Sequence, residues 1–168
     1  MRIPSSSRVR LASLLVLLVP LGGCPAPAEV GPIEGPVIPA GPAAERSPDL
    51  DAARARWSDA GLDAYTMTLQ RICFCPMPDY TGPFEVSVRN DAIDAVRLMG
   101  EEVDTERGMT VAALFDLIEE AYDRKAEVVD VTYDPELGYP TSIGIDYSSQ
   151  MADEEIAYRV SDLRASDR

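Results

Sequence analysis

Alternation of apolar and polar residues marks a group of short strands in this chain. Tyr65, Met67 and Leu69 alternate with polar residues, which is the period of a half-buried strand. Residues 84–88 show the same alternation, and a turn at residues 90 and 91 leads into a further strand over residues 92–99. The pattern therefore predicts three strands in this part of the chain.

A first helix is predicted ahead of these strands. Apolar residues recur at helical spacing from Leu50 to Ala60, and Gly61 stops the run. Ser47 has the form of an N-cap, because Pro48 follows it at the first helical position. A helix thus precedes three strands.

The same order recurs further along. Thr110 can cap a second helix, because apolar residues at helical spacing follow it: Val111, Leu114, Phe115, Ile118 and Tyr122. Alternating segments at residues 129–133, 143–147 and 156–160 then predict three more strands. We therefore predict an α+β fold, with one antiparallel sheet covered on one face by two helices and a duplicated helix-strand-strand-strand unit.

The chain before residue 49 has a different composition. Residues 24–48 consist mainly of Pro, Gly, Ala and Glu with isolated aliphatic residues, which is typical of a tether. Residues 49–168 are long enough for one globular domain with its own core.

The first 23 residues have the form of a secretory signal. Three arginines precede an apolar stretch at residues 11–21, which is shorter than the roughly 20 residues needed to span a bilayer. The junction Leu21-Gly22-Gly23-Cys24 resembles the processing signal of a bacterial lipoprotein. An uncleaved membrane anchor is the alternative.

The lipoprotein resemblance implies cleavage before Cys24 and acyl chains on its sulfur and new amino group. Several acyl chains give stable attachment, whereas one gives only marginal membrane binding. Pro25 after the cysteine implies sorting to the outer membrane. We therefore expect a protein that crosses the inner membrane and is lipid-anchored in the envelope, facing the periplasm or the cell surface.

Charge and composition remove several classes of function. The chain has 29 acidic and 15 basic residues, a formal net charge of −14 and no histidine. Nucleic acid is therefore not an expected partner, because phosphate binding needs clustered Lys and Arg. The lack of histidine excludes catalysis by Ser-His-Asp or Cys-His, and there is no glycine-rich phosphate loop. We predict a protein that is not an enzyme and has no cofactor.

The run Cys73-Phe74-Cys75-Pro76 is the one local motif that carries chemistry. Export to an oxidising compartment favours a disulfide between Cys73 and Cys75. Cα atoms two residues apart on an extended strand lie about 6.6 Å apart, near the upper limit for a disulfide, so the chain must bend there. Pro76 makes such a bend plausible because it cannot continue the hydrogen-bond ladder.

Two other uses of these cysteines stay open. A redox-active or intermolecular thiol pair would need a lowered thiol pKa, and Arg71 is the one nearby residue that could help. A copper(I) site would use both thiolates with Met77 as a soft third ligand. Met77 could equally be a loop or core residue.

The segment from Asp134 to Pro140 has strong turn chemistry between two strands. Leu137 and Tyr139 are candidate contacts for a partner if they lie at the tip of this loop. Packing of the turn is the alternative.

Several of these features together resemble an uncharacterised family of bacterial envelope lipoproteins. The resemblance lies in Trp57, Tyr65, the Cys73-Phe74-Cys75-Pro76 run, Gly82-Pro83, and residues 114–118, 133–140 and 143–147. It implies no specific activity. The helix-strand units are also loosely similar to PepSY modules and to the beta-lactamase inhibitory protein, which is an analogy of fold alone.

These observations favour a lipid-anchored, non-enzymatic domain that binds an envelope protein or helps assemble one. Thiol redox chemistry or copper(I) handling through Cys73 and Cys75 is one alternative. Inhibition of a secreted hydrolase by the acidic surface is another.

Overall fold

A computed structural model of the chain describes residues 41–73, 80–151 and 155–166. These contain the helices α1 (Pro48–Ala60) and α2 (Val111–Asp123) and the 3-10 helix η2 (Thr105–Arg107). The strands are β1 (Ala64–Cys73), β2 (Phe84–Arg89), β3 (Ala92–Leu98), β4 (Glu101–Val103), β5 (Val128–Tyr133), β6 (Pro140–Asp146) and β7 (Ile156–Ala165).

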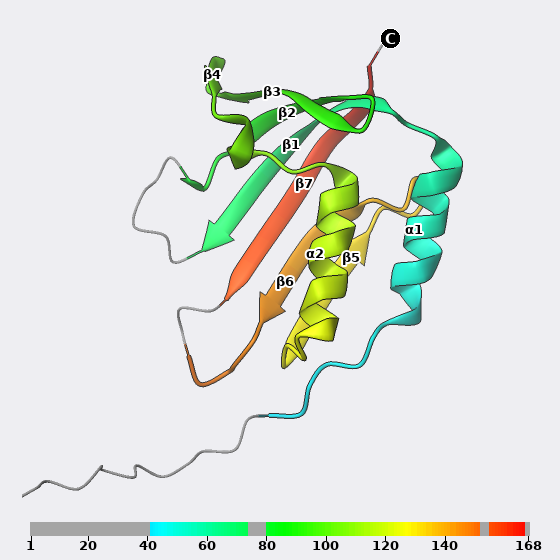
Figure 1. Cartoon of the computed structure of the whole chain (residues 1–168), viewed down its shortest axis with the longest axis vertical. Coiled ribbons are helices and arrows are strands. Elements are labelled where there is room, and N and C mark those ends of the chain that lie inside the picture. Colours follow the sequence, from blue (N-terminus) through cyan, green and yellow to red (C-terminus); the bar gives the residue numbers. More distant parts are fainter. Residues whose placement is uncertain (1–40, 74–79, 152–154, 167–168) are drawn as a thin grey trace, which may run out of the picture. The chain divides into compact units, whose positions relative to one another are not determined.

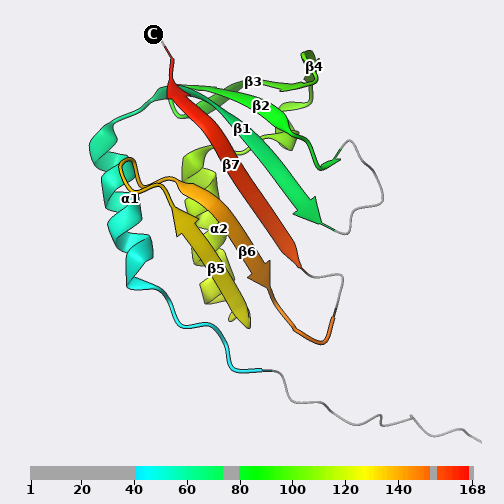
Figure 2. The ribbon, with the colours of Figure 1, turned by 180° about the vertical axis from the view of Figure 1, so that it is seen from behind.

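The seven strands form one sheet in the order β4-β3-β2-β1-β7-β6-β5, and every neighbouring pair is antiparallel. The two long strands β1 and β7 are adjacent in the middle, although they come from opposite ends of the domain. Helices α1 and α2 both lie on one face of the sheet (Figure 1). Figure 2 shows the sheet from the other side, where no described helix covers it.

The core lies between the sheet and the two helices. Alternate residues of β1 point toward the helices, and Tyr65, Met67 and Leu69 are each only 1% exposed. Leu114 and Ile118 of α2 are fully buried against them. The apolar side chains at alternate positions of the strands and those at helical spacing in α2 thus pack together in one apolar layer.

The predicted helix ends are confirmed. The Ser47 side chain accepts a hydrogen bond from the Asp49 N–H at 3.2 Å, Pro48 is the first helical residue, and Gly61 is left-handed with φ of 59°. Thr110 accepts a hydrogen bond from the Ala113 N–H at 3.1 Å. These contacts satisfy helix termini that would otherwise lack partners.

The predicted α+β fold class is wrong, because the structure is a sheet-rich fold. Strands cover 42% and helices about 26% of the described residues. The central strands β1 and β7 reach 10 residues each, and β4 adds a strand that the alternation did not reveal. More residues therefore lie in the sheet than in the helices that cover it.

The strand order also rules out the predicted duplicated unit. If the second unit were the first one shifted along the sheet, β7 would correspond to β3. Strand β3 runs parallel to β1, so β7 would also run parallel to β1. If a two-fold axis perpendicular to the sheet related the two units, β5 would lie beside β1. The structure has β7 beside β1 and antiparallel to it. Neither symmetry operation gives this arrangement with both helices on one face of the sheet.

The segment just before α1 lies against the domain. The Ala44 N–H donates to the Ala126 carbonyl at 2.7 Å, and the Gly41 N–H donates to the Glu127 carboxylate at 2.5 Å. The Glu127 carboxylate also accepts from the Ser149 N–H at 2.8 Å, and the bonds from Ser149 and Gly41 hold the pKa of Glu127 below its usual range. Residues 41–44 therefore follow the domain surface.

The boundaries predicted at residues 23, 24 and 48 stay predictions, and residues 1–40 lie outside the described ranges. Within those ranges, neither helix has the length and apolar character needed to cross a membrane.

Candidate functional site

The predicted cysteine motif lies at the end of the central strand. Cys73 is the last residue of β1, whereas Cys24, Cys75 and Met77 lie outside the described residues. The Arg71 N–H donates to the Thr81 carbonyl at 3.0 Å, so the chain on either side of the motif is joined by a hydrogen bond. The disulfide, redox and copper(I) hypotheses stay predictions. In the described part of the chain, no group of three or more His, Cys, Asp or Glu side chains is placed to hold a metal ion.

The loop after β5 packs inward. Tyr139 is 9% exposed, and its ring meets the Trp57 ring edge-on with centroids 6.3 Å apart. Leu137 is partly buried against the same core, and its N–H donates to the Asp134 carboxylate at 2.7 Å. Burial of these two candidate contact residues favours turn packing, the alternative that the sequence left open.

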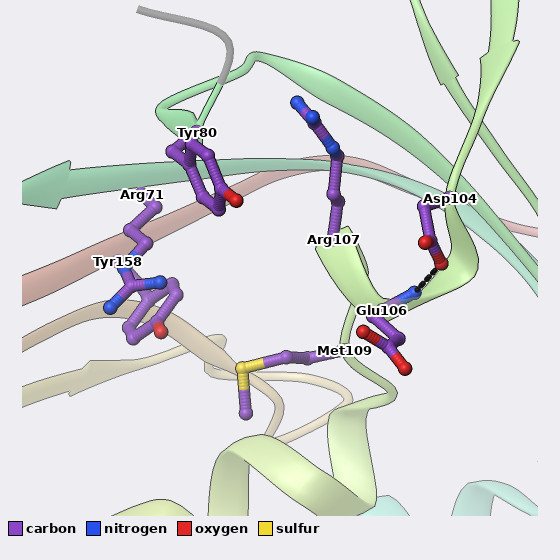
Figure 3. A pocket seen from close by; sticks show the side chains of 7 residues that line it. All are labelled: Arg71, Tyr80, Asp104, Glu106, Arg107, Met109 and Tyr158. Atoms are coloured by element: carbon purple, nitrogen blue, oxygen red, sulfur yellow. Dashed lines mark hydrogen bonds between the residues drawn. The ribbon is translucent and has the colours of Figure 1, made fainter. Parts of the chain in front are cut away.

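A more promising site lies at the other end of the helix-covered face. A cavity of about 240 Å³ is enclosed there by residues from β1, β7, η2 and the segments beside them. We call it the arginine–tyrosine pocket, and it is lined by Arg71, Tyr80, Asp104, Glu106, Arg107, Met109 and Tyr158. Figure 3 shows Arg71 and Tyr158 together on one side, Tyr80 near Arg107, and Met109 across from Tyr80.

One pair of the pocket comes from neighbouring central strands. Arg71 of β1 and Tyr158 of β7 are direct partners in the strand register, so their side chains share the helix-covered face. The Arg71 guanidinium carbon lies 5.9 Å from the centre of the Tyr158 ring, within the range of a cation–π contact. The Arg71 Nε is buried and has no hydrogen-bond partner among the described residues.

Burial of Tyr158 makes the floor of the pocket apolar. The side chain is 7% exposed, and burial raises the pKa of its hydroxyl, while nearby Arg71 opposes that rise. Tyr158 therefore stays neutral at physiological pH and presents a ring to the guanidinium.

The second pair comes from η2 and from the chain that enters β2. The Arg107 guanidinium carbon lies 4.9 Å from the centre of the Tyr80 ring. The η2 turn holds Arg107 in place, because the Asp104 side chain accepts from the Glu106 N–H at 3.0 Å and the Gly108 N–H donates to the Thr105 carbonyl at 3.0 Å. Two arginines, each next to a tyrosine ring, thus line one cavity.

This arrangement suits the binding of an anionic group. A guanidinium is charged at every physiological pH and offers planar donors that match a carboxylate. Tyr158, which is 7% exposed, limits access of water beside Arg71 and so strengthens a charged hydrogen bond there, whereas Tyr80 beside Arg107 is 45% exposed. Asp104 and Glu106 also line the pocket, are exposed, and carry charges opposite to those of the two arginines.

Sequence reasoning missed this pocket. Arg71 was considered only as an aid to a thiol, and Tyr80, Arg107 and Tyr158 were not recognised as one site. Arg107 and Tyr158 are far in the chain from Arg71 and Tyr80, and the four meet only because β1 pairs with β7 and η2 folds back beside them. No spacing motif in the sequence could have connected them.

Comparison with known proteins gives a family without an assigned activity. A model described as "Family of unknown function (DUF6174)" matches residues 49–165. No curated protein and no solved structure was found to match.

Proposed function

We propose, on the premise that this chain belongs to the DUF6174 family of unknown function, that it is a non-enzymatic binding domain of the cell envelope. Its arginine–tyrosine pocket holds a carboxylate group of a partner protein. The observation that carries the proposal is the pair of guanidinium groups, each beside a tyrosine ring, at one cavity of about 240 Å³.

The chemistry of the lining residues supports binding more than turnover. Arginine does not give up its proton in proteins, and Tyr158 has a pKa raised above its ordinary value, so neither is suited to act as a base near neutral pH. The two acids at the rim are exposed to solvent. The pocket can therefore orient and neutralise an anion.

An extended peptide is the ligand form that fits this pocket. A cavity of about 240 Å³ has room for one side chain or one chain terminus but not for a folded surface. The free C-terminal carboxylate of a partner, or a single Asp or Glu in a loop, would bind the Arg71 guanidinium, while the positive charge of Arg107, which Figure 3 shows on another side of the pocket, would add to the attraction. Capture of one terminal carboxylate is a recurrent mode of peptide recognition.

The proposal places the domain on a lipid anchor at Cys24. The support is in the sequence, where a charged segment, an apolar stretch and Gly22-Gly23-Cys24 follow one another. Intact-mass measurement of the protein from the membrane fraction tests the anchor. We expect a chain that begins at Cys24 and carries acyl groups, and the Cys24→Ala variant should leave that fraction. An unprocessed amino terminus would contradict this part of the proposal.

The same proposal includes a disulfide between Cys73 and Cys75. The support is export to an oxidising compartment, and the hydrogen bond between Arg71 and Thr81 brings together the chain on either side of the motif. Reduction and alkylation should add the mass of two labels to the folded protein only after reductant is added. Labelling without reductant would favour the thiol or copper(I) alternatives.

A peptide-binding experiment tests the pocket. Dye-labelled peptides with a free C-terminal carboxylate are titrated with the full chain, and the same peptides with an amidated C-terminus serve as the ligand control. The Arg71→Gln and Arg107→Gln variants remove one guanidinium each. Arg159→Gln is the matched protein control, because Arg159 neighbours Tyr158 on β7 but is exposed and points to the opposite face.

We expect each pocket variant to weaken binding of the free-carboxylate peptide about tenfold, the loss typical of one charged hydrogen bond. Arg159→Gln should bind as the unmodified protein does. Equal affinity for the free and amidated peptides, or equal losses in all three variants, would contradict the proposed function.

A further inference from the structure

The face of the sheet away from the helices has a hollow near one end. It measures about 540 Å³ and lies over β5, β6 and β7 and the last residues of β1. These strands are exposed to view in Figure 2, with no described helix in front of them. We call this region the sheet-face hollow.

Two small residues create the hollow. Gly144 of β6 is the register partner of Ala157 of β7 on one side and of Asp130 of β5 on the other. Ala157 is in turn the partner of Ile72 of β1. Ile72, Ala157, Gly144 and Asp130 therefore lie side by side across four strands. The two central residues have little or no side chain, whereas Ile72 and Asp130 at the two ends have larger ones.

The walls are apolar and exposed. Ile72 is 40% exposed and Val128 is 48% exposed, which makes them two of the large apolar side chains that the described surface leaves uncovered. Exposed apolar side chains gathered around a depression are typical of an interaction site, whereas single ones are ordinary. One apolar side chain of a ligand could fill the space above Gly144.

The charges around the hollow are mostly negative. Asp130, Asp146 and Glu155 line it. Strand alternation places Asp130 and Asp146 on this face, and Glu155 directly precedes β7. Arg159 is the basic residue next along β7 on the same face. The rim therefore carries more acid than base.

We propose that the sheet-face hollow binds an extended basic segment of a partner protein, with an apolar side chain in the hollow and flanking Lys or Arg on the acidic rim. Charge complementarity with the rim selects this occupant. The formal net charge of −14 on the whole chain would also attract a basic segment over longer distances.

This surface is separate from the arginine–tyrosine pocket. Ala157 lines the hollow and its neighbour Tyr158 lines the pocket, and consecutive residues of a strand point to opposite faces. A ligand on one face would leave the other free. The inference therefore does not depend on the proposed function.

Gly144 offers a direct way to block the hollow. A Cβ at this position would meet only the Asp130 carbonyl oxygen at 3.8 Å and the Asp130 Cβ at 4.0 Å, which is ordinary contact. The Gly144→Leu variant should thus fold with a filled hollow. Ser87→Leu adds the same side chain to the same face on β2, three strands away, and is the matched control.

The probe is a dye-labelled peptide, Lys-Lys-Leu-Leu-Lys-Lys, whose binding to the full chain is followed by fluorescence anisotropy. A peptide with Glu in place of every Lys is the ligand control. A second variant combines Asp130→Asn and Glu155→Gln, both at exposed positions where folding is not at risk.

We expect Gly144→Leu to weaken binding of the basic peptide at least tenfold and Ser87→Leu to leave it unchanged. The double charge variant should weaken it and reduce its salt dependence. Unchanged binding in both the Gly144→Leu and the double variant would overturn the proposal. Self-association in sedimentation that Gly144→Leu abolishes would also overturn it, because the hollow would then hold a second copy.

Discussion

The Tyr65 hydroxyl accepts a hydrogen bond from the backbone N–H of Val111 at 2.8 Å. Tyr65 lies on the central strand β1, and Val111 is the first residue of α2. The first N–H groups of a helix have no partner within it, so this contact satisfies one of them inside the core. It also fixes where α2 begins over the sheet.

Loss of this hydroxyl should destabilise the fold. The Tyr65→Phe variant keeps the ring that meets Trp57 edge-on at 5.3 Å but leaves the Val111 N–H buried without its acceptor. We expect a loss of about 1–3 kcal/mol in the free energy of unfolding. Urea denaturation followed by fluorescence of Trp57 measures it.

Tyr122→Phe on α2 is the control, because Tyr122 is only partly buried. It should change the urea midpoint much less than Tyr65→Phe does. Similar losses in both variants would show that the bond to Val111 has no special role.

Stability should fall at alkaline pH. Burial raises the pKa of Tyr65 from 10.0 to about 12, and the pKa of Tyr133 likewise to about 12. Between pH 10 and about pH 12, these two tyrosines lose their protons in the unfolded chain but keep them in the folded chain, so unfolding becomes more favourable as the pH rises. Below pH 10 both states hold the proton and these groups have no effect.

The measurement is the urea midpoint as a function of pH, with tyrosinate absorbance followed in parallel. We expect a flat midpoint up to about pH 10 and a decline toward about pH 12, with a shallower decline for Tyr65→Phe. Tyrosinate formation in the folded protein with an ordinary pKa for every tyrosine would contradict the burial of Tyr65.

Local elements could be predicted from the sequence, whereas their assembly could not. Ser47, Gly61 and Thr110 act through neighbouring backbone atoms, so their roles are visible in a short window. The pairing of β1 with β7 joins residues such as Tyr65 and Ala165 that are far apart in the chain, and alternation carries no information on strand order. The missed pocket follows from that one long-range pairing, whereas the fold-class error follows from the share of strand in the structure.

Strand β4 was missed for a different reason. It has only three residues, and Glu101 and Glu102 are both exposed. Periodicity needs four or more residues to be recognised. The short strand is visible only beside its partner β3.

Gly138 should be intolerant of any side chain. Its φ is +82°, and a Cβ there would lie 2.3 Å from the Ala53 carbonyl oxygen of α1. Gly138→Ala must therefore push the loop away from the helix, and we expect a loss on the order of 3 kcal/mol or more. Thermal and urea unfolding both report it.

Gly61→Ala provides the comparison for backbone strain alone. Gly61 has φ of +59° but no atom within 4 Å of the added Cβ. It should cost only about 1–2 kcal/mol. If Gly138→Ala costs no more than Gly61→Ala, the close approach of this loop to α1 is not needed for stability.

The ion pairs across the helices should contribute little. Glu119 of α2 accepts from Arg46 at 2.9 Å and lies 3.2 Å from an Arg54 nitrogen, and its side chain is 33% exposed. Surface pairs of this kind are typically worth less than about 1 kcal/mol. Glu119→Gln should lower the free energy of unfolding by no more than that, and added salt should shrink the difference.

Glu120→Gln is the matched control, because Glu120 has a single, longer contact of 3.4 Å to Arg124 and its side chain is 60% exposed. We expect no measurable change for it. A loss above 2 kcal/mol for Glu119→Gln would mean that α1 is held to α2 mainly by charge rather than by the apolar core.

Side-chain NMR of arginine Nε–H groups shows whether Arg71 contacts the ligand in the arginine–tyrosine pocket. The Arg71 Nε is buried, whereas Arg159 is exposed on the opposite face. On titration with a peptide bearing a free C-terminal carboxylate, we expect the Arg71 signal to move and saturate while the Arg159 signal stays in place. Movement of the Arg159 signal with a stationary Arg71 signal would contradict this contact.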